Sequence, residues 1–327
     1  MPSGLLIDLN DGGKPMEITA GLRCPTYGGA ISGGIGNVNT ATVEGYVAGS
    51  NVIFIPTQTV ISDEGIFKLD SVTISGANVT QNWSGNSNPG FPNPQRVAFS
   101  GTLWQILPVS QNSNVGLLVQ NSTDFTAITT ASRVGYCIYK ARVTVGTSGW
   151  ITPTIAGFDR SKYLVCCKWD SPYTLDYDGN RLLFLNDGSN IDDQPMSGTV
   201  DVIIFAGGVT PVAANPGFNI YNAAGQCTFS TARRPFVYLG TNFVPSTSAQ
   251  TVPGGGYVPV GRFGLRVPSF GGGRIYHYHY GLVMQNGTLR AGRGCMSAGL
   301  TGSSRTPGLR RSRYPLSPIC TSEPFQY

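Results

Sequence analysis

The apolar residues of this chain come in short runs rich in Val, Ile, Thr, Tyr and Phe, which clusters of Gly, Pro, Asn or Ser interrupt about every 8 to 12 residues. Such runs are too short for a helix of more than a turn or two, and β-branched and aromatic residues favour extended strands. Glycine and proline number 44 and 22 among 327 residues, without the strict period of collagen. The spacing predicts an all-β protein of many short strands.

A short ordered pattern occurs three times. Each copy opens with glycine and apolar residues, passes through a turn rich in Asn, Asp or Gly, and ends in an arginine followed by a tyrosine. The copies run from Gly4 to Arg23, from Gly116 to Arg133 and from Gly217 to Arg234. The separation is 17 positions in the last two copies (133 − 116 and 234 − 217) and 19 in the first (23 − 4). Each copy predicts a β-hairpin; the alternative is a chance match within a Gly-rich β-protein.

Proline- and asparagine-rich stretches precede the second and third copies and have the composition of domain joints. Enough residues for one small sandwich follow each hairpin. We therefore predict three tandem small β-sandwich-like domains, each opened by a β-hairpin. Their expected bounds are 1–110 with hairpin 4–23, 111–212 with hairpin 116–133, and 213–289 with hairpin 217–234, followed by a basic Gly/Pro-rich C-terminal tail at 290–327.

The third copy resembles the opening motif of β-rich accessory proteins from the tail tips and tail fibres of long-tailed (siphovirus-like) phages and prophages. Those proteins place Gly, two apolar residues, Asn, Gly and Phe in a fixed order, which is followed here by Gly217, Phe218, Ile220, Asn222, Gly225 and Phe229. The chain departs from the motif by lacking an Asp after the Phe, and its first copy is looser. The resemblance covers only the three hairpin segments. It implies a structural role in a virion and brings no catalytic residue with it.

Charge and cysteine usage narrow the class further. Only 12% of residues are charged, which suits a surface in permanent contact with partners better than a free soluble protein. The net charge of +5 gathers in the last forty or so residues, so we expect no specific nucleic-acid binding by the body. The sequence has no apolar run of the roughly 18 residues that a membrane span needs. Its seven cysteines include no C-x-x-C pair and are expected to stay reduced.

Few residues offer catalytic chemistry. Two histidines and 17 acids leave few acid–base combinations, and no nucleophile elbow, zinc-protease helix or phosphate loop occurs. Asp192 and Asp193 are the nominal glycosidase pair, although adjacent side chains should diverge. Asp176, Asp178 and Asn180 have the spacing that opens a calcium loop but lack its closing Glu, and the Asp-Gly between two alternating arms predicts a hairpin instead. We expect no enzyme.

Both histidines, His277 and His279, fall in one tyrosine-rich strand. With a period of two they share one face, while Tyr276, Tyr278 and Tyr280 share the other. The simpler interpretation is an exposed pair beside an aromatic ladder. In a trimer, three such strands on the axis would offer six nitrogens to one transition-metal ion, which resembles the His-x-His iron sites of some trimeric phage fibres. We otherwise expect no cofactor. The three tyrosines are the candidate glycan contacts.

The last residues are basic, and we expect them to dock on another protein of the particle. Glycine and proline prevent a self-contained core, so contacts made elsewhere must offset the ordering cost. A tail that binds nucleic acid is the alternative. The candidate docking residues are Arg290, Arg293, Arg305, Arg310, Arg311, Arg313, Phe325 and Tyr327.

The sequence as a whole predicts a structural virion protein of a phage tail tip or tail fibre that serves tail assembly and host attachment. We expect assembly in the host cytoplasm, a homo-oligomer with a trimer favoured, contacts with other tail proteins, and a host surface receptor as a further partner. The alternatives are a capsid decoration or connector protein and a glycan-binding or glycan-cleaving tailspike domain.

Overall fold

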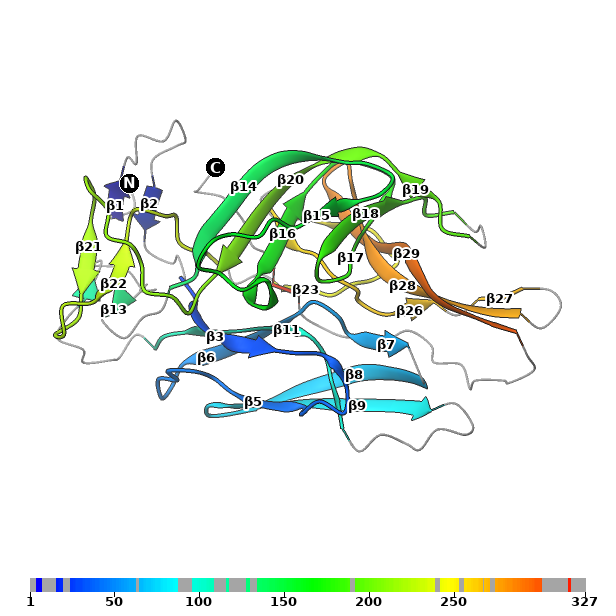
Figure 1. The fold of residues 1–327 in the computed structure, drawn as a ribbon, viewed down its shortest axis with the longest axis horizontal. Helices are drawn as coiled ribbons and strands as arrows, with labels where there is room; N and C mark the ends of the chain where they lie inside the picture. Colours follow the sequence, from blue (N-terminus) through cyan, green and yellow to red (C-terminus); the bar gives the residue numbers. More distant parts are fainter. Residues whose placement is uncertain are drawn as a thin grey trace.

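The fold is all-β, as the sequence predicts. The computed structural model describes residues 4–7, 16–19, 24–62, 65–87, 96–108, 116–117, 128–129, 134–188, 192–238, 242–252, 256–266, 268–270, 274–301 and 317–318. Within these ranges the helical content is one 3-10 turn, η1 (Arg160–Lys162), whose first residues are capped by the Asp159 side chain. Figure 1 shows two bodies of strands, a blue and cyan one below a green and orange one.

The lower body is a sandwich formed by the first block of sequence. Its strands are β3 (Thr26–Ile31), β11 (Gly101–Ile106) and β6 (Asn51–Pro56) in one sheet, β5 (Thr40–Thr42), β9 (Asn78–Ser87), β8 (Gly65–Ser75) and β7 (Val60–Ser62) in another, and the short pair β4 (Gly34–Ile35) and β10 (Val97–Ala98). Phe54, Phe67, Phe99 and Leu103 are among its core side chains. β9 continues to Ser87 because it pairs with β8 along its length.

A buried amide lies within this sandwich. Gln81 is fully buried, and its side chain donates to the backbone oxygen of Phe99 and accepts from the Phe99 N–H, both at 2.8 Å. A buried amide without partners would cost about 1–3 kcal/mol, so the two reciprocal bonds explain how a polar residue is accommodated here. They tie β9 to the segment that leads into β11.

The upper body is a second sandwich that combines the second and third blocks. One sheet has the order β14 (Tyr136–Val145), β20 (Gly198–Ala206), β16 (Leu164–Lys168) and β25 (Val258–Pro259). The other has the order β15 (Trp150–Ile151), β18 (Arg181–Leu185), β17 (Thr174–Tyr177), β28 (Arg274–Gln285), β29 (Thr288–Thr301) and β24 (Gln250–Thr251), with β19 (Pro195–Met196), β26 (Leu265–Arg266) and β27 (Ser269–Phe270) beside it.

These sheets cross the domain boundary that the sequence predicts at residues 212 and 213. β25 pairs with β16, and β28 pairs with β17. One core of buried side chains, including Trp169, Phe184 and Leu282, extends across both blocks. The structure therefore differs from three independent tandem domains, because strands of the third block pair with strands of the second block in the same sheets.

Each of the three segments predicted as hairpins contains an antiparallel strand pair. The pairs are β1 (Gly4–Ile7) with β2 (Met16–Thr19), β12 (Gly116–Leu117) with β13 (Ile128–Thr129), and β21 (Asn219–Tyr221) with β22 (Cys227–Ser230). The opening glycine faces a threonine in the first two copies, whereas in the third copy Ser230 faces Asn219, two residues after the glycine. A shift of two keeps the same side chains on each face. Figure 1 places β1, β2, β13, β21 and β22 at the same end of the molecule.

The chain segments that leave the three hairpins lie side by side. Gly135 N–H donates to Pro25 O at 3.2 Å, Phe236 N–H donates to Gly135 O at 2.6 Å, and Cys137 N–H donates to Arg234 O at 2.8 Å. The repeated tyrosines Tyr27, Tyr136 and Tyr238 are all buried in or beside this junction. The repeat thus gives equivalent segments a common place in the fold.

An aromatic cluster fills the junction. The ring of Trp104 lies 5.3 Å from that of Tyr27 and 4.8 Å from that of Phe236, which in turn lies 4.9 Å from Phe205. Trp104 comes from β11 of the lower sandwich and Phe205 from β20 of the upper one. Edge-to-face aromatic pairs add about 0.5–1.5 kcal/mol each beyond the area they bury. The two sandwiches therefore share a core here.

Gly135 is predicted to be intolerant of any side chain. A Cβ at this position would overlap the Trp104 ring and lie 3.3 Å from Phe236 Cβ. We expect Gly135→Ala to lower the free energy of unfolding by about 1–3 kcal/mol, the usual cost of overpacking. Urea denaturation followed by tryptophan fluorescence measures this. Gly146→Ala is the matched control because nothing lies within 4 Å of its added Cβ; equal stabilities of the two variants would contradict the packing described here.

Candidate functional site

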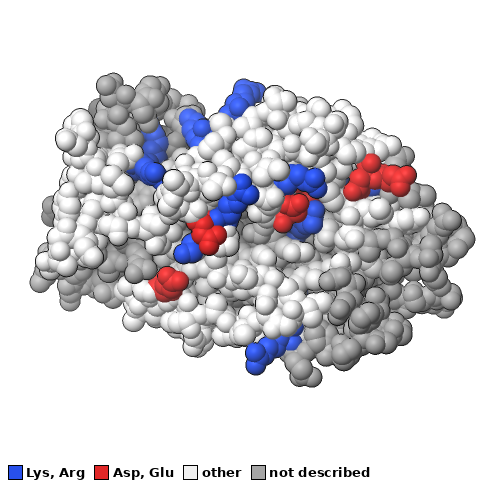
Figure 2. Space-filling view, in the orientation of Figure 1, with Lys and Arg blue, Asp and Glu red and all other residues white. Residues whose placement is uncertain are grey.

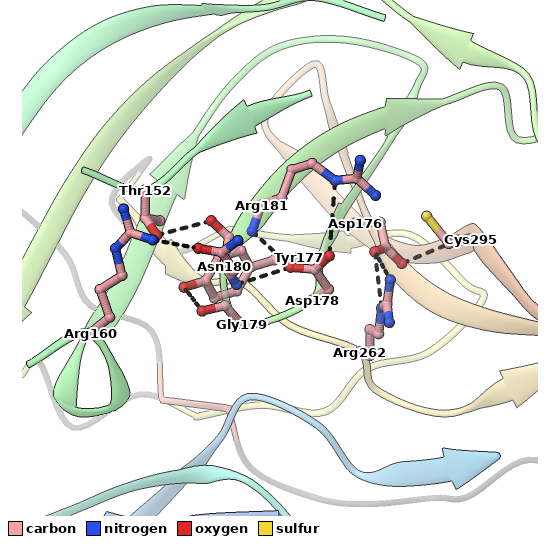
Figure 3. A network of polar contacts seen from close by, with 10 residues as sticks. All are labelled: Thr152, Arg160, Asp176, Tyr177, Asp178, Gly179, Asn180, Arg181, Arg262 and Cys295. Atoms are coloured by element: carbon pink, nitrogen blue, oxygen red, sulfur yellow. Dashed lines mark hydrogen bonds and ion pairs between the residues drawn. The ribbon is translucent and has the colours of Figure 1, made fainter. Parts of the chain in front are cut away.

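A set of arginine–aspartate pairs lies around β17 and β29 in the upper sandwich. Asp176 in β17 is 1% exposed. Its Oδ1 accepts from Nε and Nη2 of Arg262 at 3.0 and 2.9 Å, and its Oδ2 accepts from the backbone N–H of Cys295 at 3.2 Å (Figure 3). A Cβ at Gly294 would overlap Oδ2, so glycine permits this close approach. Both oxygens of Asp176 are therefore used inside the protein.

Two further pairs connect the segment between β18 and β19 to β29. Arg290 pairs with Asp187, and Arg293 Nη2 pairs with Asp193 Oδ1 at 3.1 Å. The backbone N–H of Arg293 also donates to Asp187 at 2.6 Å. The Arg293 guanidinium lies 4.3 Å from the centre of the Tyr278 ring, a cation–π distance. Three acids from residues 176–193 thus hold three arginines from residues 262–293.

Arg290 and Arg293 were predicted to belong to a docking tail, and the structure places them elsewhere. β29 runs Thr288–Thr301 and pairs with β28 along most of its length, so the predicted tail boundary at residue 290 falls inside a strand. The sequence near them has no acid before Glu323, and their acidic partners come from about a hundred residues earlier in the chain. Their charges are neutralised within the chain.

The other predicted docking residues lie outside the described residues: Arg305, Arg310, Arg311, Arg313, Phe325 and Tyr327. One short strand is described between them, β30 (Ser317–Pro318), which pairs with β23 (Asn242–Phe243). The C-terminal segment thus returns to the upper body at that point.

The histidines occupy a different environment from the one expected. His277 and His279 are each 3% exposed, and Tyr278 between them is 1% exposed, while Tyr276 and Tyr280 are half-buried. Register shifts on both sides of Tyr278 break the simple alternation of faces. His277 Nδ1 bonds the Ser62 hydroxyl at 3.0 Å. The chain itself covers both rings, so the exposed pair that the sequence predicts is not observed.

Burial makes both imidazoles poor bases. It lowers the pKa of His277, and burial together with the nearby Arg262 guanidinium lowers the pKa of His279 to about 4. His277 Nε2 and His279 Nδ1 have no hydrogen-bond partner in the part of the chain that the structure describes. The two side chains are neutral at pH 7 and belong to the core.

Asp176 and Asp178, the first two residues of the calcium-loop spacing, both bond groups of the chain itself. The Asp178-Gly179-Asn180 turn closes the hairpin of β17 and β18, as predicted, and Asp178 Oδ1 accepts from the N–H groups of Asn180 and Arg181. Asp176 points instead toward Arg262 (Figure 3). No group of three or more His, Cys, Asp and Glu side chains within the described ranges is placed to hold a metal ion.

Asp193 is half-buried, and this burial raises its pKa, although the Met296 N–H and Arg293 act in the opposite direction. A raised pKa is a property of general acids. Both Asp193 oxygens, however, accept from the Met296 N–H, and Oδ1 also bonds Arg293. Asp192 is exposed, so the adjacent side chains diverge as expected. Asp176, which lies close enough to Asp193 to influence its pKa, is inaccessible.

Comparison with known proteins places the chain in a family. A family model described as "Family of unknown function (DUF6453)" matches residues 4–301. The chain belongs to this family. The matched span runs from the first residue of β1 to the last residue of β29, so it includes all three hairpins and both sandwiches. No curated protein and no solved structure matches the chain. Within the residues described, no helix is long and apolar enough to cross a membrane.

Replacing one residue of the Asp176–Arg262 pair should destabilise the protein strongly, whereas replacing both residues together should cost less than the sum of the two single losses. We expect Asp176→Asn and Arg262→Met each to lower the free energy of unfolding by about 3–5 kcal/mol, because each leaves a buried partner uncompensated. The double variant should lose less than the sum of the two. Asp70→Asn, at the more exposed Lys68–Asp70 pair, should cost at most about 1 kcal/mol and serves as the control. Additive losses in urea denaturation would contradict a coupled pair.

His279 should make stability depend on pH between 6.5 and 5. In this window the unfolded imidazole takes up a proton, whereas the folded one, with its pKa of about 4, does not. The unfolded state then binds more protons, so the free energy of unfolding falls as the pH falls, with a slope that approaches about 1.4 kcal/mol per pH unit for one such group. His279→Leu should flatten this slope in urea titrations at pH 6.5, 5.75 and 5.0. A slope unchanged by the substitution would exclude His279 as its source.

Proposed function

We propose that the chain is a structural protein of a virion, located at the tail tip or tail fibre of a long-tailed phage, where it contributes to tail assembly and host attachment. The observation that carries the proposal is the threefold repeat of a hairpin that resembles the opening motif of phage tail-tip proteins. The segments that leave the three copies hydrogen-bond to one another, and the copies lie at the same end of the molecule (Figure 1). A partner that meets this end would contact all three.

The surface supports a role in permanent contacts. Figure 2 shows one face of the molecule, on which charged side chains form a few separate spots among uncharged atoms. Acidic and basic spots adjoin each other on that face, and several charged side chains are paired within the chain, such as Arg142 with Asp201 and Lys68 with Asp70. A surface with few unpaired charges loses little hydration free energy when a partner covers it.

The hydrogen bonds of three aspartates in the upper sandwich favour a non-enzymatic role. Asp176, Asp187 and Asp193 all bond arginines or backbone N–H groups that join strands. A catalytic carboxylate needs access to substrate, and removing any of these three would disturb the packing first. Tyr278, one of the three candidate glycan contacts, is covered by the chain, which leaves Tyr276 and Tyr280 half-buried on either side. This weighs against a tailspike domain that binds or cleaves glycans.

The segment after β29 keeps its proposed docking role with a new boundary. Residues 302–327 follow both the last strand of the upper sandwich and the span matched by the family. Arg290 and Arg293 take no part in this docking, because acids within the chain already bind them. We retain a homo-oligomer, with a trimer favoured, other tail proteins as partners and a host receptor as expectations of the same proposal.

Fractionated particles test the proposal. Virions from the genome that encodes the chain are separated into capsids and tails, and the chain is detected by quantitative mass spectrometry. We expect it in the tail fraction, in a copy number divisible by three. Detection in the capsid fraction would favour a decoration or connector protein, and absence from both fractions would overturn the proposal.

Two truncations give the experiment internal controls. Removing residues 302–327 deletes the two-residue strand β30 but leaves every other strand intact, so we expect a folded protein that particles no longer incorporate. Removing residues 290–327 should unfold the upper sandwich, because it deletes most of β29 and two of the three arginine–aspartate pairs. Incorporation of the shorter truncation at the wild-type level would rule out the docking role of residues 302–327.

A further inference from the structure

A pocket of about 200 Å³ opens at the base of the third hairpin. Tyr136 of β14, Phe158, Pro211, Val212, Ser230 of β22 and Arg233 contribute to its walls. The walls thus combine parts of the second and third repeats with two loops of the upper sandwich. Apolar groups dominate, and one guanidinium stands among them.

Arg233 differs from the arginines of the interior. It is exposed, and no acid forms an ion pair with it in the described part of the chain. Its guanidinium lies 5.0 Å from the centre of the Phe158 ring, which fixes its orientation at the pocket. Asp159, the residue after Phe158, accepts from the Ser161 N–H through Oδ1 at 2.9 Å and forms no ion pair with Arg233 in the described part of the chain. The Arg233 charge is therefore available to an external carboxylate.

Val212 forms an apolar rim on the same pocket. It is 75% exposed, a higher fraction than for any other large apolar residue described as exposed. A single exposed valine is ordinary. Val212 lies beside Pro211, and both line the same pocket as Arg233. The pocket therefore combines an apolar surface with a cation next to it.

The size of the pocket restricts its occupant. Sites for cofactors and drug-sized ligands are usually about 300–1,000 Å³. A pocket of about 200 Å³ is better matched to one inserted side chain. Interfaces commonly use such an anchor surrounded by polar contacts that exclude water.

We propose that this pocket receives an apolar side chain of another virion protein, with an adjacent Asp or Glu of that protein pairing with Arg233. The inference rests on the proposed virion role and names the chemistry of one partner contact. Arginine is suited to this because it binds a carboxylate through two parallel hydrogen bonds. A partner with an acidic residue beside an apolar one on an exposed loop or strand end fits the site.

The test introduces Arg233→Glu and, separately, Val212→Asp into the phage genome and measures the chain in purified particles. Each change should lower incorporation at limiting expression about tenfold or more, equivalent to 1.4 kcal/mol or more of lost contact free energy. Arg233→Lys keeps the charge but loses the fork geometry and should fall between. The matched controls are Arg96→Glu and Val38→Asp, two exposed residues of the lower sandwich. Circular dichroism and thermal melting of the purified variants must match the wild type.

Second-site suppressors of Arg233→Glu identify the partner. We expect an acid-to-base change in the gene of another virion protein. A suppressor at an acid of this same chain would assign the pocket to a second copy and overturn the proposal as stated. Normal incorporation of both pocket variants, with wild-type chain present in particles, would overturn the pocket contact alone. Wild-type chain missing from particles would overturn the virion role together with it.

Discussion

The packing of Trp104 between Tyr27 and Phe236 is the contact on which the rest of the structure depends. Trp104 belongs to the lower sandwich, and Phe236 belongs to the segment that leaves the third hairpin. Gly135 passes against the same ring and donates to Pro25 while it accepts from Phe236. One aromatic cluster therefore joins two sandwiches and lies where the chain leaves all three hairpins.

Three arginine–aspartate pairs connect strands of the upper sandwich in addition to its apolar packing. Asp176, Asp187 and Asp193 lie in or near the hairpin of β17 and β18, and their arginine partners lie in β29 or directly after β25. A buried ion pair gives little net stability over an apolar pair of the same shape. It does penalise alternative registers strongly, because a slipped β29 would leave buried charges without partners. The pairs thus specify how the last long strand is placed.

The same arrangement separates structural chemistry from surfaces that remain available. The buried charges form ion pairs between strands, and burial keeps the imidazole of His279 neutral. What the described surface offers is the base of the third hairpin with Arg233, Phe158 and Val212. A protein whose charged groups pair between strands, and whose hairpins and apolar pocket are exposed, is suited to the assembly role proposed above.

The sequence by itself determined the all-β class, the three hairpin segments and the Asp-Gly turn at Gly179, because these depend on residues close together in the chain. Tertiary structure alone decided that the second and third blocks share one sandwich, that β29 continues past residue 290, and that His277 and His279 are buried. Each of these depends on partners far away in sequence: β25 pairs with β16, Asp187 binds Arg290, and register shifts around Tyr278 cancel the alternation that local periodicity predicts. Strand pairing between distant segments leaves no local pattern, since many registers satisfy the same alternation of apolar residues.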